Sequence, residues 1–378
     1  MSEPIGLYLH IPFCRSKCPY CDFCSFPHPR EEIVRAYAGE LARRVRAAGA
    51  RVERSVDTVY FGGGTPTLLP LDCVEDLTAA VRESFALLPD VEYTVECNPA
   101  AADRKALAVW RAGGVNRLSM GVQSAHEAEL RALGRLHRRE DVVRTVADAR
   151  AVGIENINLD FMLGIPHQTA ASLSETLHFA LSLEPQHLSA YTLMLEEGTP
   201  FFRRGRAALG LPPDEEEADD MAADRFEEAS AILRAAGYEH YEISNYARPG
   251  YRSRHNLHTW QSHDYLGLGV AAHSCLDAVR FGNSRDLDAF IAGEDITEFR
   301  TPIPPADREG EYIMLALRLS DGIAEADFHA RFGHNFAACY GERCAPFVRE
   351  GYMEISPTRT RLTERGFLVS NAILAALL

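Results

Sequence analysis

One stretch near the N-terminus reads Tyr8-Leu-His-Ile-Pro-Phe-Cys14-Arg-Ser-Lys-Cys18-Pro-Tyr-Cys21-Asp-Phe-Cys24. Its first three cysteines follow the spacing C-x3-C-x2-C, which arises by chance in roughly one in 200 chains of this cysteine content. Three thiolates suit a cubane iron–sulfur cluster whose fourth iron stays open to a substrate or cofactor. A zinc knuckle or three packing cysteines is the alternative, although the spacing fits neither paired C-x2-C motifs nor a Cys/His zinc pattern.

Composition narrows the class of protein. The chain has 378 residues, of which 46% are hydrophobic and 25% charged, as in ordinary globular proteins. No apolar run approaches the roughly 18 residues of a membrane span, and no basic-then-apolar signal region precedes the cysteines, so we expect a cytoplasmic protein. The net charge of -15 argues against a basic face for nucleic acid. The nine cysteines then indicate ligands and free thiols instead of a disulfide framework.

Apolar strands alternate with amphipathic helices over the first half of the chain. We expect strands at residues 7–11, 57–61, 91–95, 117–122, 157–161 and 187–193, with helices between them. Such alternation implies parallel pairing through right-handed crossovers. Six units are too few for a closed eight-stranded barrel, so the prediction is an α/β fold with an open (β/α)6 partial barrel. Polar residues stand at the carboxyl ends of these strands, where such barrels place ligands.

The pattern changes after residue 195. An acidic helix is expected at residues 212–234, followed by short strand segments at 238–246 and 265–274. From residue 307 the order is three helices, a strand pair and a last helix, which predicts a small winged-helix-like domain. We therefore expect three parts, at residues 1–200, 201–300 and 301–378. The last part lacks the Lys/Arg stripe on one helix that a DNA-binding winged helix would carry.

Together these motifs resemble the radical S-adenosylmethionine (SAM) superfamily, and within it the oxygen-independent coproporphyrinogen-oxidase-like family. The resemblance implies that Cys14, Cys18 and Cys21 hold a [4Fe–4S] cluster, with SAM chelating the fourth iron. The positions that match its SAM contacts are Tyr8, Tyr20, Gly63, Gly64, Thr65, Glu96, Gln123, Arg135 and Asp160. Alternatives stay open: a plain turn for the glycines, structural hydrogen bonds for the two carboxylates, and a helix salt bridge for the arginine.

Two branches of this family differ in function. One oxidises coproporphyrinogen III, and the other is the heme chaperone (HemW-like) branch. The chain resembles the chaperone branch, because Cys14 lies close to the start and Phe23 stands where the oxidase has a fourth cysteine, with Cys24 one residue later. The segment Arg254-His-Asn-Leu-His-Thr-Trp260 resembles the heme-associated motif H-N-x-x-Y-W of that branch, with threonine in place of tyrosine.

The resemblance implies a heme-binding chaperone that delivers heme to hemoproteins. His255 is then the candidate axial ligand and Trp260 an aromatic face for the porphyrin, the alternative being a loop histidine bonded to backbone. Apo-hemoproteins and a cytoplasmic reductant are the expected partners, nucleic acid is not, and contact with a membrane surface is left open. Whether SAM is cleaved also stays open. The second hypothesis is a radical enzyme acting on a porphyrinogen or a related substrate, and a third, weaker one is an electron-transfer or nucleic-acid-binding protein.

Overall fold

The computed structural model describes residues 3–99 and 101–378, and its centre is a sheet of twelve strands in the order β14-β13-β12-β11-β1-β4-β5-β6-β7-β8-β10-β9. The six predicted strands are confirmed as consecutive parallel neighbours. They are β1 (Ile5–Ile11), β4 (Val56–Gly63), β5 (Leu87–Cys97), β6 (Arg117–Gln123), β7 (Asn156–Leu163) and β8 (His187–Thr192). Strand β5 begins four residues before its predicted start.

The sheet continues past both ends of this array. Strand β11 (Tyr265–Leu268) pairs parallel to β1. The strands β12 (His273–Leu276), β13 (Val279–Asn283) and β14 (Thr297–Pro302) follow antiparallel on that side. On the other side β10 (Asn245–Ala247) and β9 (Glu239–Glu242) pair antiparallel with β8 and with each other. The expected barrel is therefore wider than six strands, because segments of three to six residues were too short to show a period.

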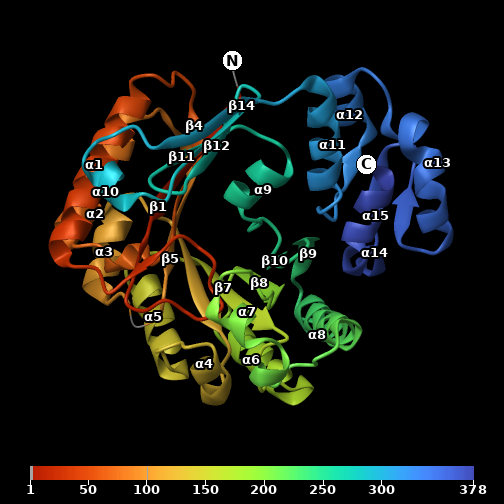
Figure 1. Cartoon of the computed structure of the whole chain (residues 1–378), viewed down its shortest axis with the longest axis horizontal. Helices are drawn as coiled ribbons and strands as arrows, with labels where there is room; N and C mark the ends of the chain where they lie inside the picture. The colour runs from red at the N-terminus through yellow and green to blue at the C-terminus, as the bar shows by residue number, and fades with distance from the viewer. Residues whose placement is uncertain (1–2, 100) are drawn as a thin grey trace.

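Helices cover the outside of the parallel strands, and Figure 1 shows them as an arc around the sheet. In α1 the residues Val34, Tyr37, Leu41 and Val45 recur every three or four positions and are all buried. The covering helices are α1 (Glu31–Gly49), α2 (Leu71–Ser84), α3 (Arg104–Ala112), α4 (Glu127–Ala132), α5 (Arg139–Ala151), α6 (Ala170–Ser182), α8 (Glu215–Ala235) and α10 (Leu287–Ile291). The short helix α7 (Pro200–Arg204) instead lies beside the cysteine loop, where the Phe201 amide donates to the Pro19 carbonyl. In the described part of the chain, every helix is too short or too polar to cross a membrane.

The C-terminal residues form a lobe with a hydrophobic core of its own, drawn in blue in Figure 1. The three helices and the strand pair follow in the predicted order, but a further strand, β15, stands after the first helix and two short helices replace the single last one, so the small sheet has three strands in the order β15-β17-β16. The elements are α11 (Pro305–Ala316), β15 (Ile323–Ala324), α12 (Glu325–Phe332), α13 (Phe336–Arg349), β16 (Met353–Ile355), β17 (Arg359–Leu362), α14 (Glu364–Leu368) and α15 (Ser370–Leu377). The division at residues 200 and 300 stays a prediction.

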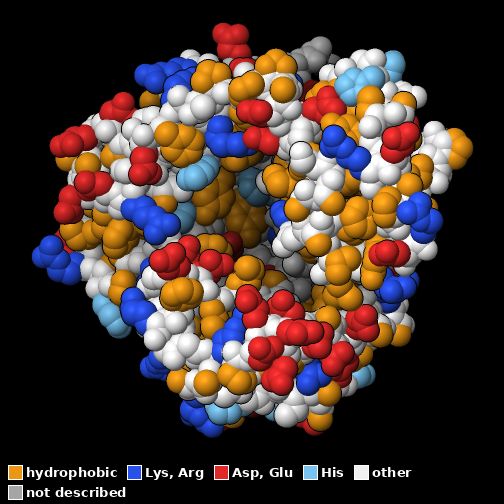
Figure 2. Space-filling model, turned by 45° about the vertical axis from the view of Figure 1, so that its right-hand side comes forward, with side chains coloured by type: hydrophobic (Ala, Val, Ile, Leu, Met, Phe, Trp, Pro, Cys, Tyr) orange, Lys and Arg blue, Asp and Glu red, His pale blue; other side chains and the backbone are white. Residues whose placement is uncertain are grey.

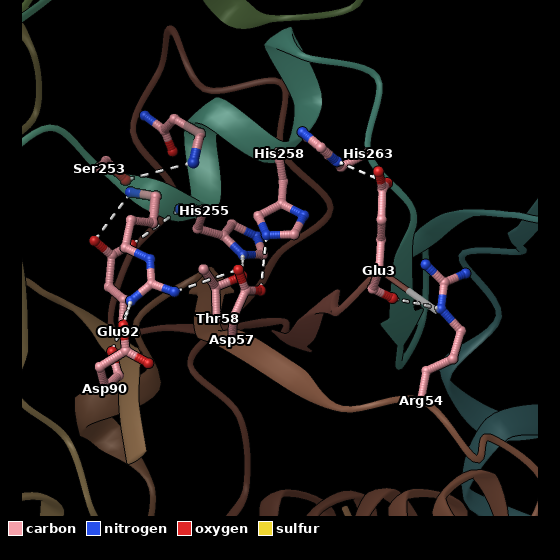
Figure 3. A network of polar contacts seen from close by, with 12 residues as sticks. Glu3, Arg54, Asp57, Thr58, Asp90, Glu92, Ser253, His255, His258 and His263 are labelled. Atoms are coloured by element: carbon pink, nitrogen blue, oxygen red, sulfur yellow. Dashed lines mark hydrogen bonds and ion pairs between the residues drawn. The ribbon is translucent and has the colours of Figure 1, made fainter. Parts of the chain in front are cut away.

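Helix α9 (Arg254–Trp260) lies on the inner side of the arc, against β1 and β4. Its N-terminus is held by the buried Glu92 of β5, whose two carboxylate oxygens each accept a backbone N–H, from Arg254 and His255, at 3.0 Å (Figure 3). A carboxylate at this position satisfies free amides and meets the positive end of the helix dipole. The helix thus closes the end of the barrel where the parallel strands begin.

We predict that Glu92→Ala lowers the free energy of unfolding by about 1–3 kcal/mol, because two buried N–H groups lose their acceptor. Denaturant unfolding followed by circular dichroism measures this loss. Asp90→Ala is the matched control, since Asp90 comes from the same strand and also contacts Arg254 but is exposed. It should change the free energy of unfolding by no more than about 1 kcal/mol. Equal effects of the two variants would contradict the role given to Glu92.

Candidate functional site

The cysteine loop starts where β1 ends. Cys14 lies on the short strand β2 (Phe13–Cys14), which pairs with β3 (Phe26–Pro27), and a turn closes between the Cys21 N–H and the Cys18 carbonyl at 3.1 Å. The Thr65 hydroxyl lies 3.6 Å from the sulfur of Cys14, and the Arg135 guanidinium 3.9 Å from that of Cys18. The structure therefore brings two of the predicted SAM contacts to two of the predicted cluster ligands.

The chemistry of these thiols fits a cluster better than a single ion. Burial raises the pKa of Cys14, and it raises that of Cys21 to about 11, so a metal must displace their protons. Among the described residues no three His, Cys, Asp or Glu side chains converge on a site for one ion. A cubane is bound through separate irons, so its thiolates need not converge on a point. This weighs against the zinc alternative.

The glycines at the end of β4 are required by packing. A Cβ at Gly63 would lie 2.3 Å from the His10 ring, and one at Gly64 would lie 2.7 Å from the backbone of Ile11 and Phe13. Gly63 also has a φ of +105°, a conformation that side chains disfavour. The sequence analysis explained these glycines by the close approach of a ligand. In the structure, the groups that leave no room for a Cβ are His10, Ile11 and Phe13 of the chain itself.

Two carboxylates point into the barrel, Glu96 from near the end of β5 and Asp160 from the middle of β7. Glu96 accepts hydrogen bonds of 2.9 Å from the Tyr60 hydroxyl and the Gly63 amide. Burial, with a smaller contribution from the charge of Asp160, raises the pKa of Glu96 to about 7. Asp160 accepts a 2.6 Å hydrogen bond from Asn158, and burial raises its pKa as well. Both carboxylates therefore make structural hydrogen bonds, which the sequence analysis gave as their alternative role. Because burial raises their pKa values, the protonation of each depends on what surrounds it.

Arg135 is a largely enclosed cation without a carboxylate partner among the described residues. Its guanidinium donates to Asn98 Oδ1 at 2.6 Å and to the Gly121 carbonyl, and no ion pair to it occurs in the described residues. The helix salt bridge proposed as its alternative role is therefore not what the structure contains. A buried charge that only neutral groups satisfy is expensive, so this site is suited to an anionic ligand.

The remaining predicted contacts surround the same space. Gln123 ends β6 with a left-handed φ of +67° and accepts a 3.2 Å hydrogen bond from Tyr191. The Tyr20 ring lies in an apolar cluster at the carboxyl ends of β7 and β8, with its centroid 6.2 Å from that of Phe201. The Tyr8 hydroxyl is hydrogen-bonded to His10 Nδ1 at 2.9 Å, and His10 Nε2 to the Cys24 carbonyl at 2.8 Å. This chain of bonds connects the lumen to the cysteine loop.

The two heme candidates lie on different sides of α9. His255 points into the barrel, where its Nδ1 is 3.0 Å from the Thr58 hydroxyl (Figure 3). Its ring stacks on that of Tyr60 with 4.9 Å between the centroids. Burial lowers the pKa of His255 to about 3, which keeps the imidazole neutral. Trp260 instead meets Arg318 of the C-terminal lobe, whose guanidinium lies 5.9 Å from the indole ring. Five residues rotate a helix by roughly 140°, so the two side chains do not share one face.

The barrel has an accessible lumen, and Figure 2 shows a deep hollow in the face that it presents. Side chains that are deeply enclosed still keep part of their surface, as Tyr8, Tyr60, Glu96, Asp160 and His255 do. Three residues that the sequence analysis missed belong to this site. Tyr60 donates a hydrogen bond to Glu96, and Asn98 is hydrogen-bonded to Thr65 and Arg135. Thr58 is hydrogen-bonded to His255. The period of two along β4 places residues 58 and 60 on one face and could have identified both.

Comparisons with known proteins identify the family and the fold. The radical SAM superfamily model matches residues 8–180, and the HemN C-terminal domain model matches residues 303–369. The heme chaperone HemW of Synechocystis sp. is 35% identical over 99% of this chain and 96% of its own length. That of Escherichia coli is 34% identical over 98% and 97%. Coproporphyrinogen III oxidase (HemN) from Escherichia coli superposes with a TM-score of 0.84 over 99% of this chain and 90% of its own, at 23% identity, which supports the fold alone.

A three-cysteine loop at the carboxyl end of a partial barrel indicates the class of protein, and the relatives that match over their full length indicate the family within that class. The chain belongs to the radical SAM superfamily and, within it, to the family of the heme chaperone HemW. The family implies a [4Fe–4S] cluster and SAM as cofactors.

We predict that Glu96 makes stability fall as pH rises. Its pKa rises from an ordinary value of 4.5 to about 7 on folding, so its contribution is fully present below pH 4.5 and is lost as pH rises through 7. The loss should be on the order of 3 kcal/mol in the free energy of unfolding. Denaturant unfolding at a series of pH values from 4.5 to 8 measures it.

Glu96→Gln imitates the protonated acid and should remove this pH dependence. Glu83→Gln, on the exposed surface of α2, is the control and should keep it. An unchanged slope in Glu96→Gln would assign the titration to another group.

Proposed function

We propose that this chain binds heme and delivers it to hemoproteins, and that it does so as a radical SAM protein of the cytoplasm. The observation that carries the proposal is the 34–35% identity to heme chaperones along almost the whole of both chains. It is supported by a barrel whose cysteine loop and buried polar residues match the cofactor motifs of the superfamily. Apo-hemoproteins are the proposed acceptors and a cytoplasmic reductant the proposed electron donor.

In this proposal Cys14, Cys18 and Cys21 hold the [4Fe–4S] cluster. Arg135 pairs with the carboxylate of SAM, which would give the buried guanidinium its missing counter-charge. Glu96, Gln123 and Asp160 hold the polar parts of SAM, and the other proposed contacts are Tyr8, Tyr20, Gly63, Gly64 and Thr65. Bound together, the two cofactors would supply one-electron chemistry at the carboxyl ends of the strands.

Hemin titration of the anaerobically reconstituted protein tests the function. We expect saturable binding, seen as a change in Soret absorbance, followed by transfer of the heme to apomyoglobin as a probe acceptor. A protein that holds its cluster and binds no hemin would contradict the proposal. Formation of 5′-deoxyadenosine in step with a porphyrin product would instead support the radical-enzyme alternative.

The cluster assignment predicts different outcomes for neighbouring cysteines. Cys21→Ala should lose the cluster, because the loop then offers two thiolates instead of three. Cys24→Ala should keep it, because the sulfur of Cys24 is buried and only its carbonyl is engaged, by His10. Iron content and absorbance after reconstitution measure both. Loss of the cluster in Cys24→Ala would show that Cys24 is a ligand.

The SAM assignment predicts a binding defect in Arg135→Gln. The side-chain amide of glutamine has no charge and is shorter than the guanidinium that reaches Asn98 and Gly121, so the dissociation constant of SAM should rise about 10- to 100-fold. The free energy of unfolding of the cofactor-free protein should change by less than about 1 kcal/mol, because the variant also removes a buried charge. Equilibrium binding and denaturant unfolding measure the two quantities.

Arg104→Gln is the matched control, because Arg104 is exposed and pairs with Asp148 on the outer surface. It should leave the affinity for SAM unchanged. Unchanged affinity in Arg135→Gln as well would contradict the assignment.

A further inference from the structure

A second cavity, of about 390 Å³, lies between the edge of the sheet and the C-terminal lobe. Its floor is a row of side chains across three strands, because Tyr265 of β11 pairs with Cys275 of β12, which in turn pairs with Arg280 of β13. Its wall is made by α11 and α12, including Tyr312 and Phe332, whose rings are 5.6 Å apart. The cavity therefore combines aromatic surfaces with a thiol in the row between them.

The charges around the cavity leave two cations uncompensated. Arg280 is neutralised by a bidentate ion pair with Glu311, whose two carboxylate oxygens lie 3.0 and 2.8 Å from the two terminal guanidinium nitrogens. Arg308 and Arg331 line the same cavity and are exposed, and neither forms an ion pair with any residue that the structure describes. The Arg331 guanidinium lies 4.9 Å from the Tyr312 ring centroid. In a chain of net charge -15, two guanidinium groups without a carboxylate partner among the described residues, beside a cavity lined by both polar and apolar side chains, favour an amphipathic ligand with two negative charges.

Cys275, in the middle of the floor, is a side chain that suits iron. It is a free, half-buried cysteine. Burial raises the pKa of its thiol, and the nearby Arg280 opposes that rise. Binding of a metal would replace the thiol proton. His263 also lines the cavity, but its Nδ1 faces Glu3 at 3.4 Å. Thiolate and imidazole are both known heme ligands, and the floor presents the sulfur.

We propose that this cavity is the binding site of the heme cargo. The macrocycle packs between Tyr265, Tyr312 and Phe332, its two propionates pair with Arg308 and Arg331, and Cys275 binds the iron as a thiolate, releasing its proton to solvent. This inference rests on the proposed function and moves the cargo away from His255, which faces the barrel lumen. A site rimmed by exposed arginines keeps the propionate edge of heme at the surface, where an acceptor can reach it.

Two probes separate the parts of this site. Hemin tests the whole site, and iron-free protoporphyrin IX tests the aromatic walls and the arginines alone. The double variant Arg308→Gln/Arg331→Gln should weaken both probes by at least about tenfold. Cys275→Ala should weaken hemin and shift its Soret maximum while leaving protoporphyrin IX unchanged. His255→Ala should bind both probes as the wild type does.

The control is Arg139→Gln/Arg300→Gln, which removes two arginines that also lie over aromatic rings, Phe179 and Phe281, but do not line the cavity. It should change neither affinity. Absorbance of the reconstituted cluster in every variant confirms that the fold is intact.

Failure of the inference and failure of the proposed function give different results. If the wild type binds no hemin, the proposed function fails. If it binds hemin and the cavity variants bind equally well, the inference alone is overturned. Loss of hemin binding in His255→Ala, with the cavity variants unaffected, would overturn it in favour of the lumen.

Discussion

The end of β4 lies so close to the end of β1 that positions 63 and 64 have no room for a side chain. This approach is fixed by backbone hydrogen bonds from the Gly64 amide to the Ile11 carbonyl at 2.9 Å and from the Thr65 amide to the Phe13 carbonyl at 2.8 Å. Because Phe13 leads directly into Cys14, the same bonds fix the start of the cysteine loop. They also place Thr65 beside the Cys14 sulfur and the Gly63 amide on Glu96. A steric requirement at two glycines thus sets the geometry of thiol, hydroxyl and carboxylate together.

The interior of the barrel is unusually rich in ionisable groups for a buried space. Arg135 lacks a carboxylate, while the pKa values of Glu96 and Asp160 are raised by burial. Each of these features is unfavourable in the chain alone and would be relieved by a ligand that brings its own charges. Loading of the cofactors and stability of the barrel are therefore expected to be linked.

The sequence predicted the parallel strands and the cluster loop, because apolar runs and cysteine spacing are local signals. It also predicted that polar residues would lie at the carboxyl ends of these strands, while the roles of Glu96, Gln123 and Asp160 came from the family resemblance and stay predictions. It did not predict β11 as a further parallel strand, because four residues carry no readable period. Nor could it place His255 and Trp260 on opposite sides of α9, since contacts with Thr58 and Arg318 decide this. The cavity beneath α11 joins segments distant in the chain, which no local pattern encodes.

The anchoring of α9 also bears on the order in which the molecule is assembled. Its bonds to Glu92 join residues 162 and 163 positions apart, so they cannot form until both distant segments have been made. During synthesis the strands from β1 to β8 leave the ribosome before residue 254 does. Until α9 docks, the nascent barrel is open at the end opposite its cysteine loop. Before α9 docks, the interior of the barrel is open to a ligand at both ends. Docking of this two-turn helix closes one of them.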